Sequence, residues 1–227
     1  MIYFLLFISL LHVIEEDFRK IFGEDYAKAL RMIEENHRLM DSLSNEYKID
    51  LSLTKAIIFP ELIRYNLIRD LVEKNTLEIV YINTGMADFS IGPMQIKPSF
   101  AERVEKELQF NPKLREFKTR LEYNSDNPVE IRKERLERLK SFDKQVYYVF
   151  AFQKYMKAEH PFLRRKNREY QLRFLSTAYN YDFQASRKDI EEFMEKSFFP
   201  WGRFNDRKKY NYADISWYYY QNEINKE

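Results

Sequence analysis

The 227-residue chain has no cysteine, only four glycines and only three histidines. Without cysteine it can form neither a disulfide nor a thiolate metal site, and no thiol nucleophile is available. His12, His37 and His160 do not have the spacing of metal ligands or of a Ser-His-Asp triad, and no glycine-rich phosphate loop is present. We therefore predict that the protein binds no metal and needs no cofactor.

Positive and negative charges are nearly balanced, since the chain has 38 lysines and arginines and 36 aspartates and glutamates, for a net charge of +2. Nucleic-acid binding usually needs a concentrated basic surface. Two short basic runs, Arg164–Lys166 and Arg207–Lys209, are more typical of solvated faces. We expect no nucleic-acid partner.

Long apolar runs are absent apart from residues 2–13 at the start of the chain. This run is too short to span a bilayer comfortably, but it is long enough for the core of a signal peptide. No lysine or arginine precedes it and no Ala-x-Ala cleavage site follows, which leaves a buried first helix as the alternative. Its length and position favour an export signal, which would occupy residues 1–14.

The scarcity of glycine and proline, with abundant Leu, Ile, Glu, Lys and Arg, favours a mostly helical fold. Helical patterns extend over residues 15–47, 51–72, 98–108, 127–156, 168–181 and 189–198. Pro60 lies inside the second pattern and is expected to kink that helix just before Glu61. We divide the chain into the segment 1–14, an N-terminal helical extension over 15–50 and one helical domain over 51–227.

Three short blocks contain candidate site residues. Ile57-Ile58-Phe59-Pro60-Glu61 places an acid among apolar neighbours, and lost hydration raises the pKa of such an acid so that it can stay protonated. Gly92-Pro93-Met94-Gln95-Ile96-Lys97-Pro98 combines an amide with a glycine that lets the backbone approach a ligand or another helix. Ala178-Tyr179-Asn180 adds a phenol and a second amide. An acid, a tight turn and an amide are parts that a sugar-cleaving site needs.

In this order the three blocks resemble those of the soluble lytic transglycosylases, over residues 51–185. The resemblance implies a mostly α, lysozyme-like domain of the goose-type lysozyme and transglycosylase class. It also implies cleavage of peptidoglycan between N-acetylmuramic acid and N-acetylglucosamine. Glu61 and Tyr179 match the catalytic positions, and the implied substrate-binding residues are Ser90, Gly92, Met94, Gln95 and Asn180.

The resemblance further implies a reaction that consumes no water. Glu61 gives its proton to the glycosidic oxygen and then takes one from the 6-hydroxyl, which attacks the anomeric carbon and forms a 1,6-anhydro sugar. The substrate's own N-acetyl group assists, so no second acid is needed. Asp88, the acid next to the glycine block, is interpreted as a loop-stabilising group instead of a nucleophile. The expected partner is the peptidoglycan glycan strand, and the expected location is the periplasm or cell envelope.

The chain departs from the family's pattern near two of the blocks. Leu62 stands where the family has serine after the acid, and Tyr181 and Asp182 stand where it has alanine and glycine. Three alternatives therefore stay open: a hydrolase of the same fold, a catalytically silent peptidoglycan-binding envelope protein, and a helical adaptor without sugar affinity.

Several candidate residues also have a structural interpretation. Arg64 would be a helix-surface partner of Glu61, Met94 a core residue and Asn180 a helix cap. An aromatic group near the chain end could stack on sugar rings, although we favour a role in the core. Its members are Trp201, Tyr212, Trp217 and Tyr218–Tyr220.

Overall fold

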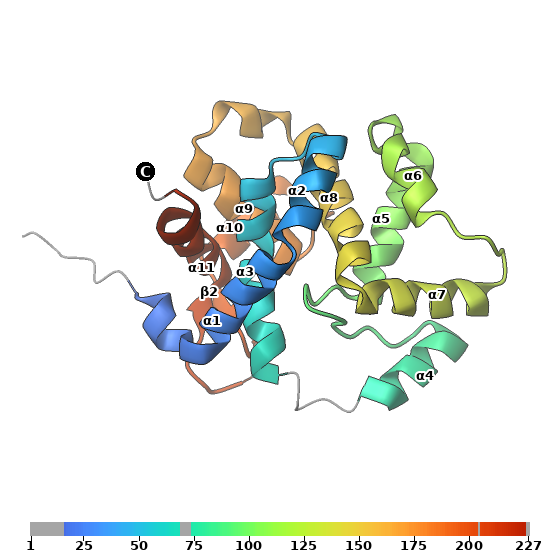
Figure 1. The fold of residues 1–227 in the computed structure, drawn as a ribbon, viewed down its shortest axis with the longest axis horizontal. Coiled ribbons are helices and arrows are strands. Elements are labelled where there is room, and N and C mark those ends of the chain that lie inside the picture. Colours follow the sequence, from blue (N-terminus) through green and yellow to red (C-terminus); the bar gives the residue numbers. More distant parts are fainter. Residues whose placement is uncertain (1–15, 69–73, 204, 226–227) are drawn as a thin grey trace, which may run out of the picture.

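The computed structural model describes residues 16–68, 74–203 and 205–225, which fold mostly into helices (Figure 1). The α-helices are α1 (Phe18–Glu35), α2 (His37–Tyr47), α3 (Leu51–Ile68), α4 (Lys74–Thr84), α5 (Pro98–Phe110), α6 (Arg115–Leu121), α7 (Pro128–Lys140), α8 (Phe142–Glu159), α9 (Arg168–Asn180), α10 (Arg187–Met194) and α11 (Tyr212–Tyr219). The shorter elements are the 3-10 turns η1 (Pro112–Leu114) and η2 (Pro161–Arg165), the π-helical turn η3 (Tyr220–Ile224), and the antiparallel strands β1 (Ser197–Phe199) and β2 (Tyr210–Asn211). The prediction of a mostly helical protein is confirmed.

Helix α3 lies inside the core and is enclosed by other helices. Residues 56–59 on this helix are completely buried. A helix with no continuous polar face is expected to be covered on all sides. Indeed α3 contacts α1, α2, α8, α9 and α11. Glu61, two positions beyond this buried run, is therefore surrounded by protein and is only 3% exposed.

Helix α8 joins two groups of helices. On one side α1, α9 and α11 pack around α3, and on the other α4, α5, α6 and α7 lie together (Figure 1). Helix α8 contacts α2, α3 and α9 as well as α5, α6 and α7. Residues 85–97, between α4 and α5, pass through the middle of the view in Figure 1. The block that contains Gln95 therefore lies where the two groups meet.

Local signals define several helix starts as expected. Asp50 accepts a hydrogen bond from the backbone N–H of Leu53 (3.1 Å) and begins α3. Asn127 accepts one from Val129 (2.9 Å) and begins α7, while Pro98 occupies the first turn of α5. These are the preferred residues for N-caps and first helical turns. Helix α3 continues through Pro60 to Ile68.

Two of the expected helices have other boundaries. The single helix predicted over 127–156 is wrong, because Ser141 is extended (φ −97°, ψ 128°) and separates α7 from α8. Neither glycine nor proline marks this break, so the local pattern did not reveal it. The helix predicted over 189–198 ends at Met194, and residues 197–199 form β1 instead. Pairing with β2 supplies hydrogen bonds that a helix would otherwise make.

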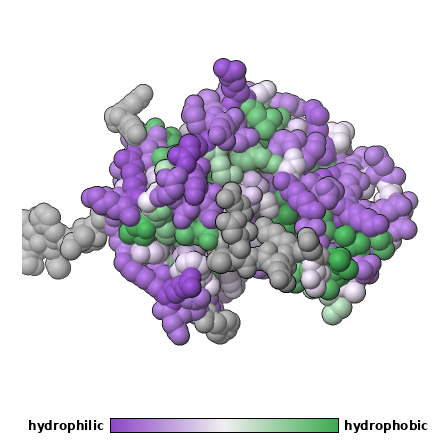
Figure 2. Space-filling model, turned by 60° about the horizontal axis from the view of Figure 1, so that its bottom comes forward, coloured by the Kyte–Doolittle hydropathy of each residue, from purple (hydrophilic) through white to green (hydrophobic). Residues whose placement is uncertain are grey.

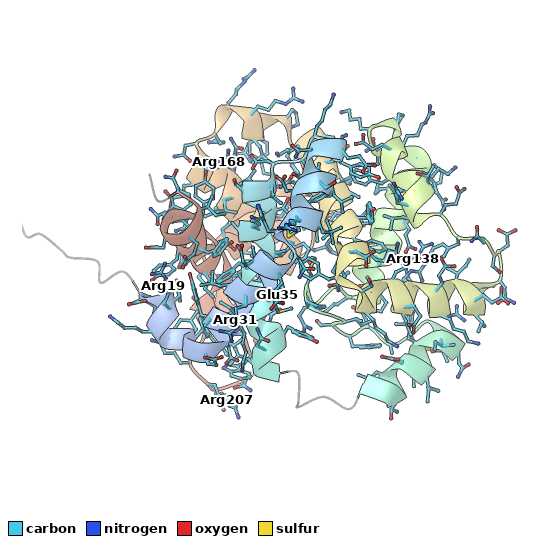
Figure 3. All side chains as sticks on the ribbon, viewed as in Figure 1. Arg19, Arg31, Glu35, Arg138, Arg168 and Arg207 are labelled. Atoms are coloured by element: carbon cyan, nitrogen blue, oxygen red, sulfur yellow. The ribbon has the colours of Figure 1, made fainter. Side chains whose placement is uncertain are left out.

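The N-terminal helices share the core with the rest of the described chain. Helix α1 packs against α3, and its Arg19, labelled in Figure 3, donates to Glu223 of η3 (2.7 Å). The Tyr218 hydroxyl donates to Asp17 (2.9 Å). The boundary between an extension over 15–50 and a domain over 51–227 stays a prediction, and the export signal expected over 1–14 lies outside the described residues.

A buried ion pair joins α5 to α7. The Glu105 carboxylate accepts bonds from Arg135 (Nε at 3.0 Å, Nη2 at 2.5 Å), from the Tyr148 hydroxyl (2.7 Å) and from the Tyr123 hydroxyl. The Nη1 group of Arg135 donates to Glu102 (2.9 Å). We call these residues the Glu105 cluster. All three guanidinium nitrogens of Arg135 and both oxygens of Glu105 have partners, as a stable buried ion pair requires.

The face shown in Figure 2 is mostly polar, but the region of α4 carries exposed apolar side chains. Figure 2 shows hydrophobic side chains gathered toward the right of that view, on the side of α4. The exposed hydrophobic side chains of this region are Leu77, Ile79, Val80 and Met86. Among the helices in the described ranges, none combines the length and hydropathy needed to cross a bilayer.

Candidate functional site

The second sequence block folds into a tight turn. Ile91 and Ile96 form an antiparallel bridge, and the Gln95 backbone N–H donates to the Gly92 carbonyl (3.1 Å). Gln95 itself has a left-handed backbone (φ 51°), which is costly for a residue with a side chain. This conformation is held by the surrounding structure, because Gln95 is only 7% exposed and its Nε2 also donates to the Gly92 carbonyl (2.8 Å).

Gly92 is required because helices approach it closely. Its φ is +65°, and a Cβ atom there would lie 2.3 Å from the Leu139 carbonyl oxygen and 2.8 Å from the Gln145 amide nitrogen. Gln145 fixes the turn at both ends, since its Nε2 donates to the Ile91 carbonyl (2.7 Å) and its Oε1 accepts from the Met94 N–H (2.9 Å). Of the two interpretations of this glycine, the close approach to another helix applies.

Helix α9 brings the third block against this turn. The Tyr179 hydroxyl donates to the Met94 carbonyl (2.9 Å), and its ring packs edge-on against Phe100 and Phe152. Asn180 is the last residue of α9, and its Oδ1 accepts from Nη2 of Arg64 (3.4 Å). The phenol therefore secures the turn, while the amide reaches across to α3.

The Glu61 carboxylate is held by a residue of its own helix. Nη1 of Arg64 donates to both carboxylate oxygens, at 2.8 and 2.9 Å. The guanidinium also lies over the Phe199 ring, with its carbon 4.8 Å from the ring centre. The Tyr212 hydroxyl donates to the Ile57 carbonyl (2.8 Å), one turn before the acid. Arg64 is therefore an internal partner of Glu61 and not the surface partner that sequence suggested.

Burial and charge act on Glu61 in opposite directions. Burial raises the pKa of the Glu61 carboxyl, while Arg64, and more weakly Lys97, lower it; the balance is a raised pKa. Burial also raises the pKa of Tyr179 and Tyr212, and the negative charge of Glu61 adds to both shifts. Both phenols therefore stay protonated near neutral pH, and the charge of Glu61 affects the pKa of each.

Glu61, Arg64 and Tyr179 help to line one small hollow. The lining residues are Glu61, Arg64, Ser90, Gln95, Ile96, Lys97, Ser99, Phe100, Arg103, Tyr179, Asn180 and Tyr181. Its volume is about 70 Å³, or roughly two water molecules at ~30 Å³ each. Glu61 is the one carboxyl group among the described residues that line it. The basic side chains at its edge have acidic neighbours, since Arg103 bonds Asp182 (2.5 Å) and Lys97 lies 3.9 Å from Asp88.

Two unpaired polar atoms distinguish this hollow. Among the described residues, three buried side-chain nitrogen or oxygen atoms have no hydrogen-bond partner, and two of them, Arg64 Nε and Gln95 Oε1, belong to residues that line it. The third is Gln153 Oε1. Exchanging the amide oxygen and nitrogen of Gln95 would not give Oε1 a partner, because only Nε2 can donate to the Gly92 carbonyl. An unsatisfied buried donor or acceptor in a folded protein calls for an explanation, such as a catalytic role or a bound water or ion.

The structure brings five of the seven candidate residues to the hollow. They are Glu61, Ser90, Gln95, Tyr179 and Asn180. Gly92 and Met94 are not in its lining, and Met94 is completely buried. Asp88 accepts from the Ser99 N–H (3.0 Å) at the start of α5, which agrees with a loop-stabilising role.

Other contributors were not singled out from sequence. Gln145 is a completely buried amide that precedes the apolar run of α8, a position that could have indicated a polar partner. Tyr212 and Tyr219 belong to the core, as expected for the aromatic tail. For Arg64 no local signal separates a surface partner from an internal one.

Two larger hollows lie elsewhere in the described structure. One, of about 520 Å³, adjoins the Glu105 cluster, and the other, of about 710 Å³, is lined by residues of α1, α2, α3 and the C-terminal turn. No residue that lines either of them has an unpaired buried side-chain atom, so they exceed the Glu61 hollow in volume but lack its unpaired polar groups. No group of three acidic, histidine or cysteine side chains in the described ranges could hold a metal ion. No protein-family model, curated protein or solved structure matches the chain.

Proposed function

We propose that the protein is a lytic transglycosylase that cleaves peptidoglycan glycan strands, with Glu61 as the acid and then the base. The observation that carries this proposal is one buried carboxyl group in a hollow formed by three separate segments: α3, the turn at Gln95, and the end of α9. A carboxyl group among apolar and phenolic neighbours can keep a proton that it would lose in water. The resemblance of the same three segments to the transglycosylase blocks selects the reaction.

In the proposed reaction one carboxyl group performs both proton transfers. Protonated Glu61 gives its proton to the glycosidic oxygen as the bond to the leaving sugar breaks. The carboxylate then takes the proton of the 6-hydroxyl, whose oxygen bonds to the anomeric carbon and closes the 1,6-anhydro ring. Since Glu61 is the one acid in the described lining, a mechanism without a second carboxylate is favoured over the usual pair.

The two unpaired atoms suggest how the sugar is held. Gln95 Oε1 needs a donor and Arg64 Nε needs an acceptor, and an acetamido group offers an N–H and a carbonyl oxygen. The hollow, at about 70 Å³, has room for such a substituent, so the sugar ring would lie across its mouth. Tyr179 would keep the Gln95 turn in place through its bond to the Met94 carbonyl. An exported protein would meet this substrate in the cell envelope.

A second function is favoured by the bond between Arg64 and both oxygens of Glu61. If this bond persists when glycan binds, Glu61 stays charged and cannot donate a proton. The protein would then bind peptidoglycan without cleaving it, as a silent envelope protein of the same fold.

The test compares purified wild-type protein with Glu61→Gln on isolated peptidoglycan, and mass spectrometry identifies the released sugars. We expect wild type to release 1,6-anhydro products and Glu61→Gln to release almost none at unchanged helical content. Glu192→Gln is the matched control, since Glu192 is an exposed acid of α10 outside the hollow. Reducing-end products would indicate a hydrolase. Equal release by wild type and Glu61→Gln would contradict the proposal, and binding without release would favour the silent alternative.

A further inference from the structure

We propose that Arg64 is a ligand-operated clamp on Glu61, which holds the carboxylate charged in the free protein and is drawn away when glycan binds. This inference rests on the proposed function and adds its regulation. It assigns to Arg64 the role of a positioning residue that makes the acid available only in the complex.

The geometry of Arg64 indicates that its bond to Glu61 can be exchanged. Its Nη1 contacts both carboxylate oxygens, but Nε has no partner and Nη2 has only a long contact to Asn180 (3.4 Å). The guanidinium rests on the face of Phe199, a surface that holds a cation without fixing its direction. One of its three nitrogens is therefore unpaired, and a second is held only by a long hydrogen bond that an entering acceptor could replace.

The clamp addresses a conflict in the proposed chemistry. A general acid must carry a proton, whereas an arginine bonded to both oxygens favours the charged carboxylate. Once Arg64 turns to the ligand, the low polarity around Glu61 favours the protonated form. The other charged or titratable groups that line the hollow, or whose pKa is shifted by Glu61, are Lys97, Arg103, Tyr179, Tyr181 and Tyr212. Lys97 and Arg103 already have the acidic neighbours Asp88 and Asp182.

The exchange has a definite proton balance. When glycan binds, an acceptor oxygen of the sugar bonds to Arg64, and Glu61 takes up one proton from the solvent. That proton goes to the glycosidic oxygen, and the 6-hydroxyl proton replaces it on Glu61. When product leaves, Arg64 returns and Glu61 releases the proton to the solvent.

Calorimetry measures this proton directly. The probe is a tetrasaccharide of N-acetylglucosamine, which has the acetamido groups but lacks the muramic acid residue at which the proposed reaction cleaves. Binding heats in two buffers of different ionisation enthalpy give the number of protons taken up. We expect about one proton per wild-type molecule at pH values between the pKa of Glu61 in the free and bound forms. Glu61→Gln should bind with no uptake.

Arg64→Met tests whether the uptake depends on the clamp. Without Arg64 the pKa of Glu61 should already be high in the free protein, so the uptake should shrink to near zero. If this variant does not fold, Arg64→Lys keeps the charge but not the planar contact, and its uptake should be smaller than in wild type. Wild-type uptake that persists in the variant would overturn the clamp. Binding without uptake between about pH 4 and 8 would also overturn it, and absence of binding would contradict both the clamp and the proposed function.

The pH dependence of cleavage gives a second readout. On the alkaline side, kcat/KM reports the pKa of Glu61 in the free protein and kcat reports it in the complex. We expect the alkaline limb of kcat to lie about one to three pH units above that of kcat/KM, the usual effect of an adjacent opposite charge. Coinciding limbs in active wild-type enzyme would overturn the clamp and leave the proposed function intact.

Discussion

Among the described residues, two glutamate–arginine pairs lie in the protein interior, and their surroundings differ. Glu105 accepts bonds from Arg135 and from the hydroxyls of Tyr123 and Tyr148, so that both of its oxygens and all three guanidinium nitrogens of Arg135 have partners. Within the described part of the chain, Arg64 is the only hydrogen-bond partner of the Glu61 carboxylate, and Nε of that arginine is unpaired. The first pair joins helices α5 and α7, while the second lies within α3 and faces a hollow.

The difference separates a structural ion pair from one that is suited to chemistry. A buried charge is stable when all its hydrogen bonds are made, and such a cluster has nothing left to offer a ligand. A pair with vacant hydrogen-bonding positions next to a hollow costs stability in the free protein, but it can exchange partners. Burial alone would have marked both glutamates, and the completeness of their bonds distinguishes them.

The largest expected effect in the comparison of the two ion pairs is a loss of catalytic activity when Glu61 is replaced. Glu61→Gln should reduce glycan release by about 10⁴-fold, because general acid–base catalysis contributes at most about that factor for one group. Stability should change little, since the amide is nearly isosteric and less costly to bury. The assays are product release by mass spectrometry and urea unfolding of the same preparations. A variant that is active yet unstable would place Glu61 with the structural pair.

The second prediction concerns the free energy of unfolding. Arg135→Met should lower it by about 3–5 kcal/mol, because Glu105 then keeps a buried charge without its cation. Arg64→Met should cost less than half as much, since Glu61 can take up a proton beside a hollow that admits water. Urea unfolding near pH 7 measures both. Equal losses in the two variants would remove the distinction between the pairs.

The third prediction concerns the turn that supports the hollow. Gly92→Ala should destabilise the protein by roughly 2–3 kcal/mol, because the new Cβ meets the Leu139 carbonyl in addition to the strain of a positive φ. Gly85→Ala is the control, since that glycine also has a positive φ (+74°) but its Cβ would be 3.7 Å from a flexible Arg132 side chain. Thermal unfolding of both variants measures the two losses of stability. Similar losses would contradict close packing as the reason for glycine at position 92.

The smallest predicted effect is the pH dependence of stability. Because burial raises the folded-state pKa of Glu61, the stability linked to its protonated form is complete below the unfolded-state pKa. It is lost as pH rises through the folded-state pKa. Wild type should therefore lose stability relative to Glu61→Gln as pH rises from about 4, near the unfolded value for glutamate. Denaturant unfolding of both proteins across this range checks the sign, and a parallel course would contradict the raised pKa.

Much of the helical structure could be predicted because its signals are local. Asp50, Asn127 and Pro98 marked helix starts through their own backbone preferences. The break at Ser141 was missed, because the extended backbone there serves a distant requirement: it orients α8 so that Gln145 reaches the turn at residues 91–94.

The candidate site was predictable only in part, for a similar reason. Three blocks in the right order indicated Glu61, Gln95 and Tyr179 as neighbours, and they line one hollow. Whether Gly92 approaches a ligand or a helix could not be known, since Leu139 and Gln145 are more than forty residues away in the chain.

By itself, the amino-acid sequence determined the helical composition, several helix starts and an acid among apolar neighbours, because these depend on residues within a few turns of each other. Only the tertiary structure decided that Arg64 faces inward and that its Nε and the Oε1 of Gln95 are left unpaired. Hydrogen-bond completeness depends on every group that packs around an atom, and those groups come from segments far apart in the chain.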